Sequence, residues 1–283
     1  MSDGPSAAGP PSPDDGRIAA RFRTAPFEPI GRFVDASNAT MLVRLTDRDH
    51  RSLDDLAAEL GRDPELDDLE PHDLAVYKPR RGEAPLWDFP TGTLHRREVA
   101  AYEISAALGW DLVPVTVLVE DGPFGVGSLQ RFVPHDPAHH FFHLLEHGDE
   151  HVLEQLRAMV VFDVVIDNAD RKGGHVLLER SQDLGASLTG TVRLIDHGVS
   201  FNVERKLRTV GWHAAGEPVP HALRDDVSRI GSEVRDGGPL RQRLGELLAA
   251  AELEALADRI GRTERVGVLP EPAGRNPYPW PMI

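Results

Sequence analysis

The stretch VVIDNADRKGGHVLLE, residues 164–179, places small and charged residues between two apolar segments. Its first residues complete the helical pattern HVLEQLRAMVVFDVVID at 151–167, and its last residues belong to the strand-like pattern GHVLLER at 174–180. Asp170, Lys172 and His175 lie between them, among the Asn, Asp and Gly residues that loops favour. The stretch therefore predicts a helix that ends near Asp167, a polar loop, and the start of a hairpin.

The second strand of this hairpin, TVRLIDHG at 191–198, leads into Asp196, so we expect Asp170 and Asp196 to face one cleft. Phosphoryl transfer needs this arrangement, because it uses a carboxylate base, metal ligands and a lysine to position and neutralise phosphate. In the kinase loop H-R-D-x-x-x-x-N, a metal-binding Asn follows the base at the distance that separates His175 from Asp170. Asp196 in D-H-G corresponds to the metal-binding Asp of D-F-G, and Lys172 is placed to reach the transferring phosphate.

In the rest of the chain, the spacing of apolar residues changes near residue 135. Before it, alternating apolar residues predict a mainly antiparallel sheet, with one helix that begins after Thr93 and ends at Gly109. The predicted strands lie within 31–45, 74–79, 112–120 and 125–133. After residue 135 the apolar spacing is helical, at 151–167, 220–234 and 240–261. We therefore predict an α+β fold with a disordered tail at 1–26, a β-rich N-lobe at 27–134, a helical C-lobe at 135–266 and a proline-rich tail at 267–283.

Composition narrows the possible functions. The 283 residues are 40% hydrophobic and carry a net charge of −15, without a block of Lys or Arg, which argues against nucleic acid as a partner. There is no cysteine, which excludes disulfides and thiolate chemistry. No apolar run approaches the roughly 18 residues that a membrane span needs, and the first residues do not resemble a signal peptide. We expect a cytoplasmic protein without membrane insertion.

The motifs YKP, REVAAY, NADRKGGH, IDHG and KLRTV together resemble the phosphatidylinositol 3/4-kinase-like superfamily. The layout is most similar to type II phosphatidylinositol 4-kinases, and the motifs to a bacterial family within that superfamily. The resemblance spans about residues 28–260 and implies an atypical two-lobed kinase-like fold that binds ATP with Mg²⁺ or Mn²⁺. It also implies phosphotransfer to a hydroxyl acceptor on a protein, a small molecule or an inositol lipid.

The resemblance assigns roles to particular residues. It implies that Asp170 is the catalytic base, that His175 and Asp196 are the metal ligands, and that Lys78 contacts the nucleotide phosphates. The remaining nucleotide-binding positions that it implies are Glu98 as the partner of Lys78, Ser37 and Asn38 in a turn over the phosphates, and the backbone near Arg131 and Val133 beside adenine.

The sequence leaves several alternatives open for the metal site and the function. His175 replaces an oxygen ligand, and Mg²⁺ prefers oxygen, so either the site uses Mn²⁺ or a single metal, or His175 only orients phosphate, or activity has been lost. The last case would make the chain a nucleotide-binding pseudokinase with a regulatory or scaffold role. The basic stretch ERKLRTVGW, residues 204–212, suits an anionic substrate or a solvated turn. A metal site on the histidine run at 139–151, where His recurs every fourth residue, is a third interpretation.

Overall fold

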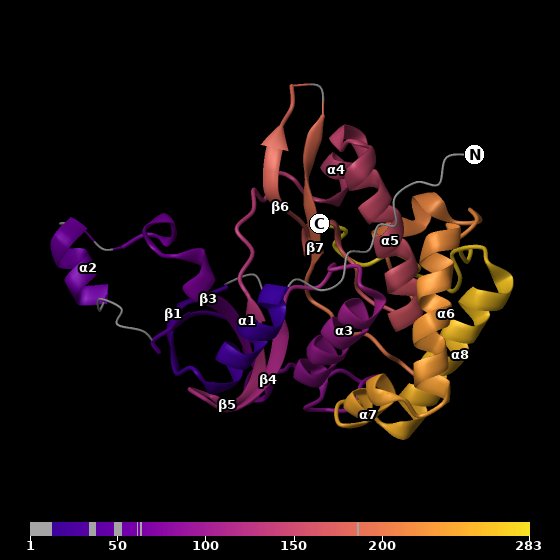
Figure 1. Cartoon of the computed structure of the whole chain (residues 1–283), viewed down its shortest axis with the longest axis horizontal. Coiled ribbons are helices and arrows are strands. Elements are labelled where there is room, and N and C mark those ends of the chain that lie inside the picture. Colours follow the sequence, from indigo (N-terminus) through magenta and orange to yellow (C-terminus); the bar gives the residue numbers. More distant parts are fainter. Residues whose placement is uncertain (1–12, 34–37, 48–52, 61, 63, 186) are drawn as a thin grey trace. The chain divides into compact units, whose positions relative to one another are not determined.

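The computed structural model describes residues 13–33, 38–47, 53–60, 62, 64–185 and 187–283 (Figure 1). Within them the chain forms two compact units. One, here called the sheet unit, comprises Pro13–His95 and Val115–Val133. The other, here called the helical unit, contains Arg96–Pro114 and Pro134–Ile283. The two units confirm the predicted α+β class, with β structure and helices concentrated in different parts of the chain.

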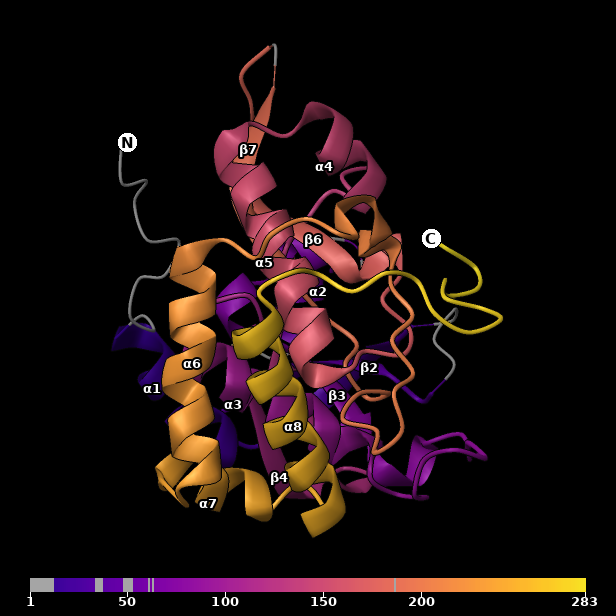
Figure 2. The ribbon, with the colours of Figure 1, turned by 90° about the vertical axis from the view of Figure 1, so that its right-hand side faces the viewer.

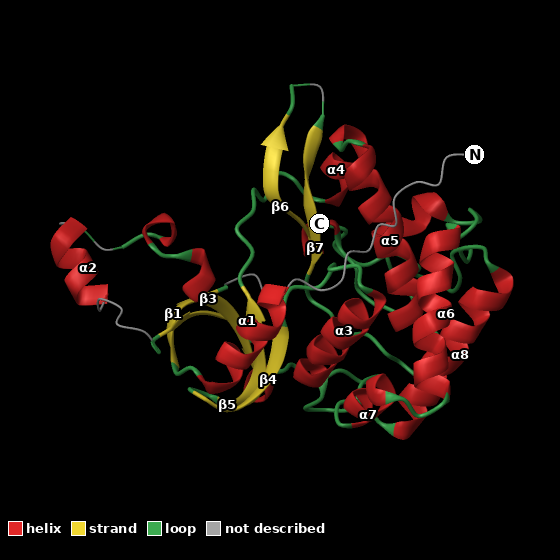
Figure 3. Cartoon of the chain, in the orientation of Figure 1, coloured by secondary structure: helices red, strands yellow, loops and turns green. Residues whose placement is uncertain are grey.

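The sheet unit is built on a five-stranded antiparallel sheet in the order β1-β2-β3-β5-β4 (Figure 3). Its strands are β1 Phe27–Arg32, β2 Met41–Leu45, β3 Leu74–Pro79, β4 Thr116–Gly122 and β5 Gly125–Arg131. Tyr77 is paired with Leu129, which is paired with Val117, so these side chains share one face of the sheet. All three are fully buried, so this face forms the core of the sheet unit.

Helix α1, Pro13–Thr24, contradicts the prediction that residues 1–26 form a tail without regular structure. Asp14 and Asp15 lie in its first turn and basic residues in its last turn, which suits the helix dipole. Ala19 and Phe22 are buried on one face of the helix, which packs against β4. The composition of this segment is polar overall, so only the spacing of its few apolar residues indicates the helix.

The helical unit contains most of the helices and a two-stranded hairpin. Its helices are α3 Leu94–Leu108, which starts in the last residues of the sheet unit, α4 Phe141–His147, α5 Glu150–Ile166, α6 His221–Arg235, α7 Pro239–Gly245 and α8 Ala250–Val266. The hairpin pairs β6 Val176–Asp183 with β7 Leu188–Leu194. Helix α8 packs against both α5 and α6 (Figures 1 and 2), and Val161, Ile230 and Leu256 of these three helices are fully buried.

Shorter elements complete the chain. Helix α2 covers Leu53–Leu60, and the 3₁₀ turns are Leu66–Asp68, Pro71–Asp73, Arg80–Gly82, Gly173–His175 and Val210–Ala214. The helical pattern at 240–261 divides into α7 and α8, because Glu252 accepts the backbone N–H of Ala249 at 2.8 Å and thereby starts a new helix. None of the helices that the structure describes is both long and apolar enough to cross a bilayer.

Candidate active site

The polar loop begins where α5 ends, at Asp167. The backbone of Asp167 is left-handed, with φ of 54°, and this conformation stops the helix. Asn168 then turns the chain, since its side-chain Oδ1 accepts the backbone N–H of Asp170 at 2.9 Å. The carbonyl of Asn168 accepts the N–H of Arg208, and the N–H of Arg171 donates to the carbonyl of Arg208. The loop is therefore held against the segment that contains Arg208.

A fully buried ion pair joins this loop to the middle of α5. Nε of Arg171 lies 3.1 Å from Oδ1 and 3.2 Å from Oδ2 of Asp163, and neither side chain has any exposed surface. Thr209 donates its hydroxyl to Asp163 at 3.1 Å. Burial raises the pKa of Asp163, and Arg171 opposes that rise. Two charges removed from water are tolerated here because hydrogen bonds satisfy both of them.

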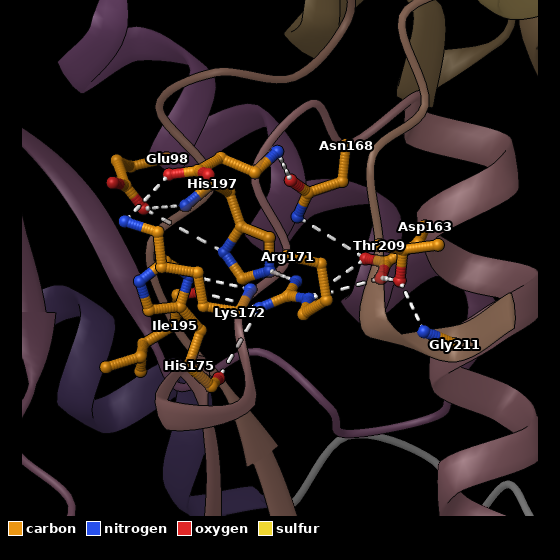
Figure 4. A network of polar contacts seen from close by, with 11 residues as sticks. Glu98, Asp163, Asn168, Arg171, Lys172, His175, Ile195, His197, Thr209 and Gly211 are labelled. Carbon is orange, nitrogen blue, oxygen red and sulfur yellow. Dashed lines mark hydrogen bonds and ion pairs between the residues drawn. The ribbon is translucent and has the colours of Figure 1, made fainter. Parts of the chain in front are cut away.

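The same arginine also holds the D-H-G segment (Figure 4). Its Nη1 donates to the carbonyl of Ile195 at 2.8 Å, and its Nη2 lies 2.8 Å from Nε2 of His197. Arginine only donates, so Nε2 of His197 is the acceptor and the imidazole is neutral with its proton on Nδ1. On the opposite side, Oε2 of Glu98 accepts the backbone N–H of His197 at 2.9 Å. Glu98 in α3 thus helps to fix the backbone that follows Asp196.

Asp170 projects from the loop and remains partly accessible, with 34% of its side chain exposed. Nζ of Lys172 lies 3.3 Å from its Oδ2. Burial raises the pKa of Asp170 and the charge of Asp196 adds to the rise, whereas Lys172 and, more weakly, Arg208 lower it. A carboxylate with a raised pKa is a stronger proton acceptor, as a general base requires.

His175 and Asp196 meet beside Asp170. Nε2 of His175 lies 3.4 Å from Oδ2 of Asp196, whose backbone is left-handed with φ of 60°. Two ligand atoms at this separation suit one divalent cation, whose bonds to nitrogen or oxygen are about 2.1 Å long. Coordination of a cation through Nε2 of His175 requires the ring proton on Nδ1. Nδ1 then no longer accepts the N–H of Lys172, which is a long contact of 3.4 Å. His175 and Asp196 can therefore bind a cation with the loss of only this one long hydrogen bond.

Comparison with known proteins places this geometry in context. No family model matches the chain. Protein Rv2133c of Mycobacterium tuberculosis (strain ATCC 25618 / H37Rv) is 40% identical over an alignment of 285 positions, and the alignment covers 90% of this chain and 91% of that protein. The chain belongs to the Rv2133c family.

Two further proteins are similar to this member of the Rv2133c family. Phosphatidylinositol 4-kinase gamma 6 of Arabidopsis thaliana is 35% identical over 125 residues, which are 42% of this chain but only 19% of that protein. The crystal structure of the Golgi casein kinase has a TM-score of 0.53 at 12% identity, covering 92% of this chain and 76% of that one. This second similarity is one of fold, and it confirms the predicted kinase-like fold.

The residues predicted from sequence fall into two groups in this Rv2133c-family chain. Asp170, Lys172, His175, Asp196 and Glu98 all belong to the helical unit, and the first four form the local contacts described above. The predicted nucleotide-binding residues of the sheet unit are Asn38, Lys78, Arg131 and Val133. Ser37 lies outside the described residues.

Two of the sheet-unit residues already make other bonds. Asn38 accepts the backbone N–H of Ala84 at 2.7 Å through its side chain, so it joins two distant segments of the sheet unit. The N–H of Arg131 donates to the carbonyl of Val115 at 2.8 Å and is thus not available to donate to adenine. The nucleotide-binding roles assigned to these four sheet-unit residues and to Glu98 stay predictions.

The histidine run begins before α4 and is then divided between two helices. His139 and His143 stack with ring centroids 5.4 Å apart, and the rings of His143 and His147 are 4.4 Å apart. Helix α4 ends at His147, and His151 belongs to α5. In the described part of the chain, no three His, Cys, Asp or Glu side chains are arranged to hold a metal ion.

Sequence reasoning missed the residues that support the loop. Asp163, Arg171, His197 and Thr209 are buried, yet none was assigned a role. One signal was present, because Asp163 interrupts the apolar run MVVFDVVI at 159–166, and a charge on a buried helix face requires a partner. The sequence alone does not say which arginine supplies it.

Substitution of Arg171 by Met should destabilise the fold, because the carboxylate of Asp163 stays buried without its partner. We expect a loss of about 3–5 kcal/mol in the free energy of unfolding, measured by urea titration. Arg157→Met is the matched control, since Arg157 pairs with Glu150 at 2.9 Å while 44% of its side chain is exposed, and its loss should be about 0–1 kcal/mol. The double variant Asp163→Asn, Arg171→Met should lose less than the sum of the single variants. Equal losses for Arg171→Met and Arg157→Met would contradict the role of the buried pair.

Substitution of Lys172 by Met should raise the pKa of Asp170 further, since it removes the nearest positive charge. The pKa is measured from the carboxyl carbon of Asp170 by NMR during a pH titration. Arg208→Met should raise the pKa less, because Arg208 acts on Asp170 only through longer-range charge. A pKa that does not change in Lys172→Met would show that the Lys172–Asp170 contact is absent in solution.

Proposed function

We propose that this protein is a phosphotransferase that uses ATP and a divalent cation to phosphorylate a hydroxyl group. The observation that carries the proposal is the convergence of Asp170, Lys172, His175 and Asp196 in a chain with a kinase-like fold. A carboxylate base, a positively charged side chain and a pair of metal ligands are the groups that phosphoryl transfer needs, since its catalysis rests on positioning and electrostatics.

In this proposal Asp170 accepts the proton of the acceptor hydroxyl as the hydroxyl oxygen attacks the γ-phosphorus. Its partial burial and raised pKa favour proton acceptance. Lys172 lies beside it and neutralises charge on the transferred group. The bonds from Arg171 to Ile195 and His197 keep the D-H-G segment at a constant position relative to this base. Orientation of this kind is a large part of enzymatic rate enhancement.

Lys78 is proposed to contact the nucleotide phosphates, with Glu98 and the backbone near Val133 assisting nucleotide binding. The match to phosphatidylinositol 4-kinase gamma 6 supports a layout like that of the phosphatidylinositol 3/4-kinases. His175 and Asp196 would hold Mg²⁺ or Mn²⁺, which when bound would neutralise negative charge on the nucleotide phosphates. Two protein ligands suffice for such an ion, because phosphate oxygens and water complete its coordination.

One observation favours a second candidate, a nucleotide-binding pseudokinase. His175 supplies nitrogen where kinases supply oxygen, and its Nδ1 already accepts from the backbone of Lys172. In this tautomer the ring proton is on Nε2. If it persisted with nucleotide bound, Nε2 would donate to Asp196 and would not bind metal. The chain would then bind ATP without transferring phosphate.

Asp170→Asn separates these functions, because an amide keeps the shape of the side chain but cannot accept the proton. We expect ATP turnover, followed as ADP formation, to fall about 100-fold or more, while calorimetry still detects ATP binding. Asp225→Asn, at an exposed position on α6, is the control and should retain turnover. Wild-type protein that binds ATP without any turnover would identify the pseudokinase, and absence of ATP binding would reject both candidates.

His175→Asn tests the metal assignment. The wild-type protein should be more active with Mn²⁺ than with Mg²⁺, since imidazole is a poor ligand for Mg²⁺. The variant restores an oxygen ligand, so the ratio of Mg²⁺ to Mn²⁺ activity should rise about tenfold. His221→Asn, exposed at the start of α6, is the control and should leave the ratio unchanged. If His175→Asn and His175→Ala both leave the ratio at its wild-type value, His175 is not a ligand.

A further inference from the structure

A pocket of about 680 Å³ opens beside Asp170 within the helical unit. One wall is formed by Asp170 and Arg208, and the other by the C-terminal segment from Arg275 to Met282. An adjoining pocket of about 370 Å³ shares Arg208, Arg275 and Asn276 with it. The two arginines therefore stand at the boundary of both pockets, next to the proposed base.

Hydrogen bonds hold both walls in position. The N–H and carbonyl of Arg208 bond to Asn168 and Arg171 of the loop, at 2.9 and 3.0 Å. The C-terminal segment follows α8 (Figure 2) and is attached at two points. The carbonyl of Pro277 accepts from Nε1 of Trp212 at 2.6 Å, and the carbonyl of Met282 accepts from the N–H of Gly173 at 2.7 Å. The pocket is thus a built feature of the helical unit.

The charge at this pocket is opposite to that of the protein. The chain has a net charge of −15, which repels anions at long range. Yet Arg208 and Arg275 line the pocket together, and in the part of the chain that the structure describes their guanidinium groups make no hydrogen bond or ion pair. Two uncommitted guanidinium groups from separate segments suit a phosphate or carboxylate, which each of them binds with paired hydrogen bonds.

We propose that this pocket is the acceptor site, and that Arg208 and Arg275 select a small hydroxyl compound that carries a phosphate or carboxylate group. This inference rests on the proposed phosphotransferase function. The acceptor hydroxyl gives its proton to Asp170 and its oxygen forms a bond to the γ-phosphorus of ATP. The bond from that phosphorus to the bridging oxygen breaks, and ADP leaves with the electron pair. The anionic group of the acceptor stays on the two arginines throughout.

The first experiment measures binding without ATP, so it does not depend on catalysis. Inorganic phosphate and glycerol 3-phosphate are titrated into the full chain by calorimetry, with glycerol as the neutral probe. Both anions should bind and glycerol should not. Arg208→Ala and Arg275→Ala should each weaken binding about tenfold or more, as expected for the loss of a hydrogen bond to a charged group. Arg265→Ala, at an exposed position on α8 that does not line the pocket, is the control and should bind as the wild type does. Binding that is absent or equal in all variants overturns the proposal.

The second experiment compares acceptors in matched pairs, glycerol with glycerol 3-phosphate and glucose with glucose 6-phosphate. The anionic member should have at least about tenfold higher kcat/KM, and Arg275→Ala should remove most of that preference. Vesicles of phosphatidylcholine with phosphatidylglycerol show whether a lipid headgroup supplies the same chemistry. ATP turnover with equal use of neutral and anionic acceptors overturns this inference and leaves the proposed function intact. Phosphorylation of an acidic peptide alone also overturns it. If no acceptor gives ATP turnover but anions still bind through Arg208 and Arg275, the proposed function is rejected and the anion-binding site is retained.

Discussion

The buried ion pair between Asp163 and Arg171 is the interaction on which the arrangement of the loop depends. Burying both charges is costly unless every hydrogen-bonding group is satisfied. Arg171 meets this requirement by bonding to Asp163, to the carbonyl of Ile195 and to His197. One guanidinium group therefore ties α5, the loop and the residues after β7 together, and a shift of any of these elements would break a hydrogen bond to this buried charge.

The proposed reactive groups lie at the edge of this buried interior. Asp163 and Arg171 have no exposed surface, whereas 34% of the Asp170 side chain and 47% of the Asp196 side chain are exposed. This division suits catalysis, because supporting residues lose little by being immobile while reacting residues must meet substrate. The C-terminal segment is likewise held by the loop, because the N–H of Gly173 donates to the carbonyl of Met282. This segment carries Arg275, which lines the pocket beside Asp170.

The relation to kinases is one of fold. The Golgi casein kinase shares the fold at 12% identity, and a fold at that distance does not define a substrate. What distinguishes this chain is local. In the proposed assignment His175 stands where kinases have an oxygen ligand, and basic residues near Arg208 create a positive pocket in an acidic protein. Both features change which metal and which acceptor the same fold would favour.

The amino-acid sequence by itself determined the α+β class, the main strands, helices α3, α5 and α6, and the order of Asp170, His175 and Asp196, because apolar period and loop composition are local properties. It missed helix α1, whose few apolar residues gain stability only by packing on β4. It also did not identify Arg171 as the partner of Asp163, or Arg275 as a neighbour of Arg208. Arg171 is only eight residues from Asp163 but lies beyond the end of α5, and Arg275 is distant in the chain from Arg208. Tertiary structure decides both placements, because the energy of a charge depends on the charges and the water that surround it once the chain is folded.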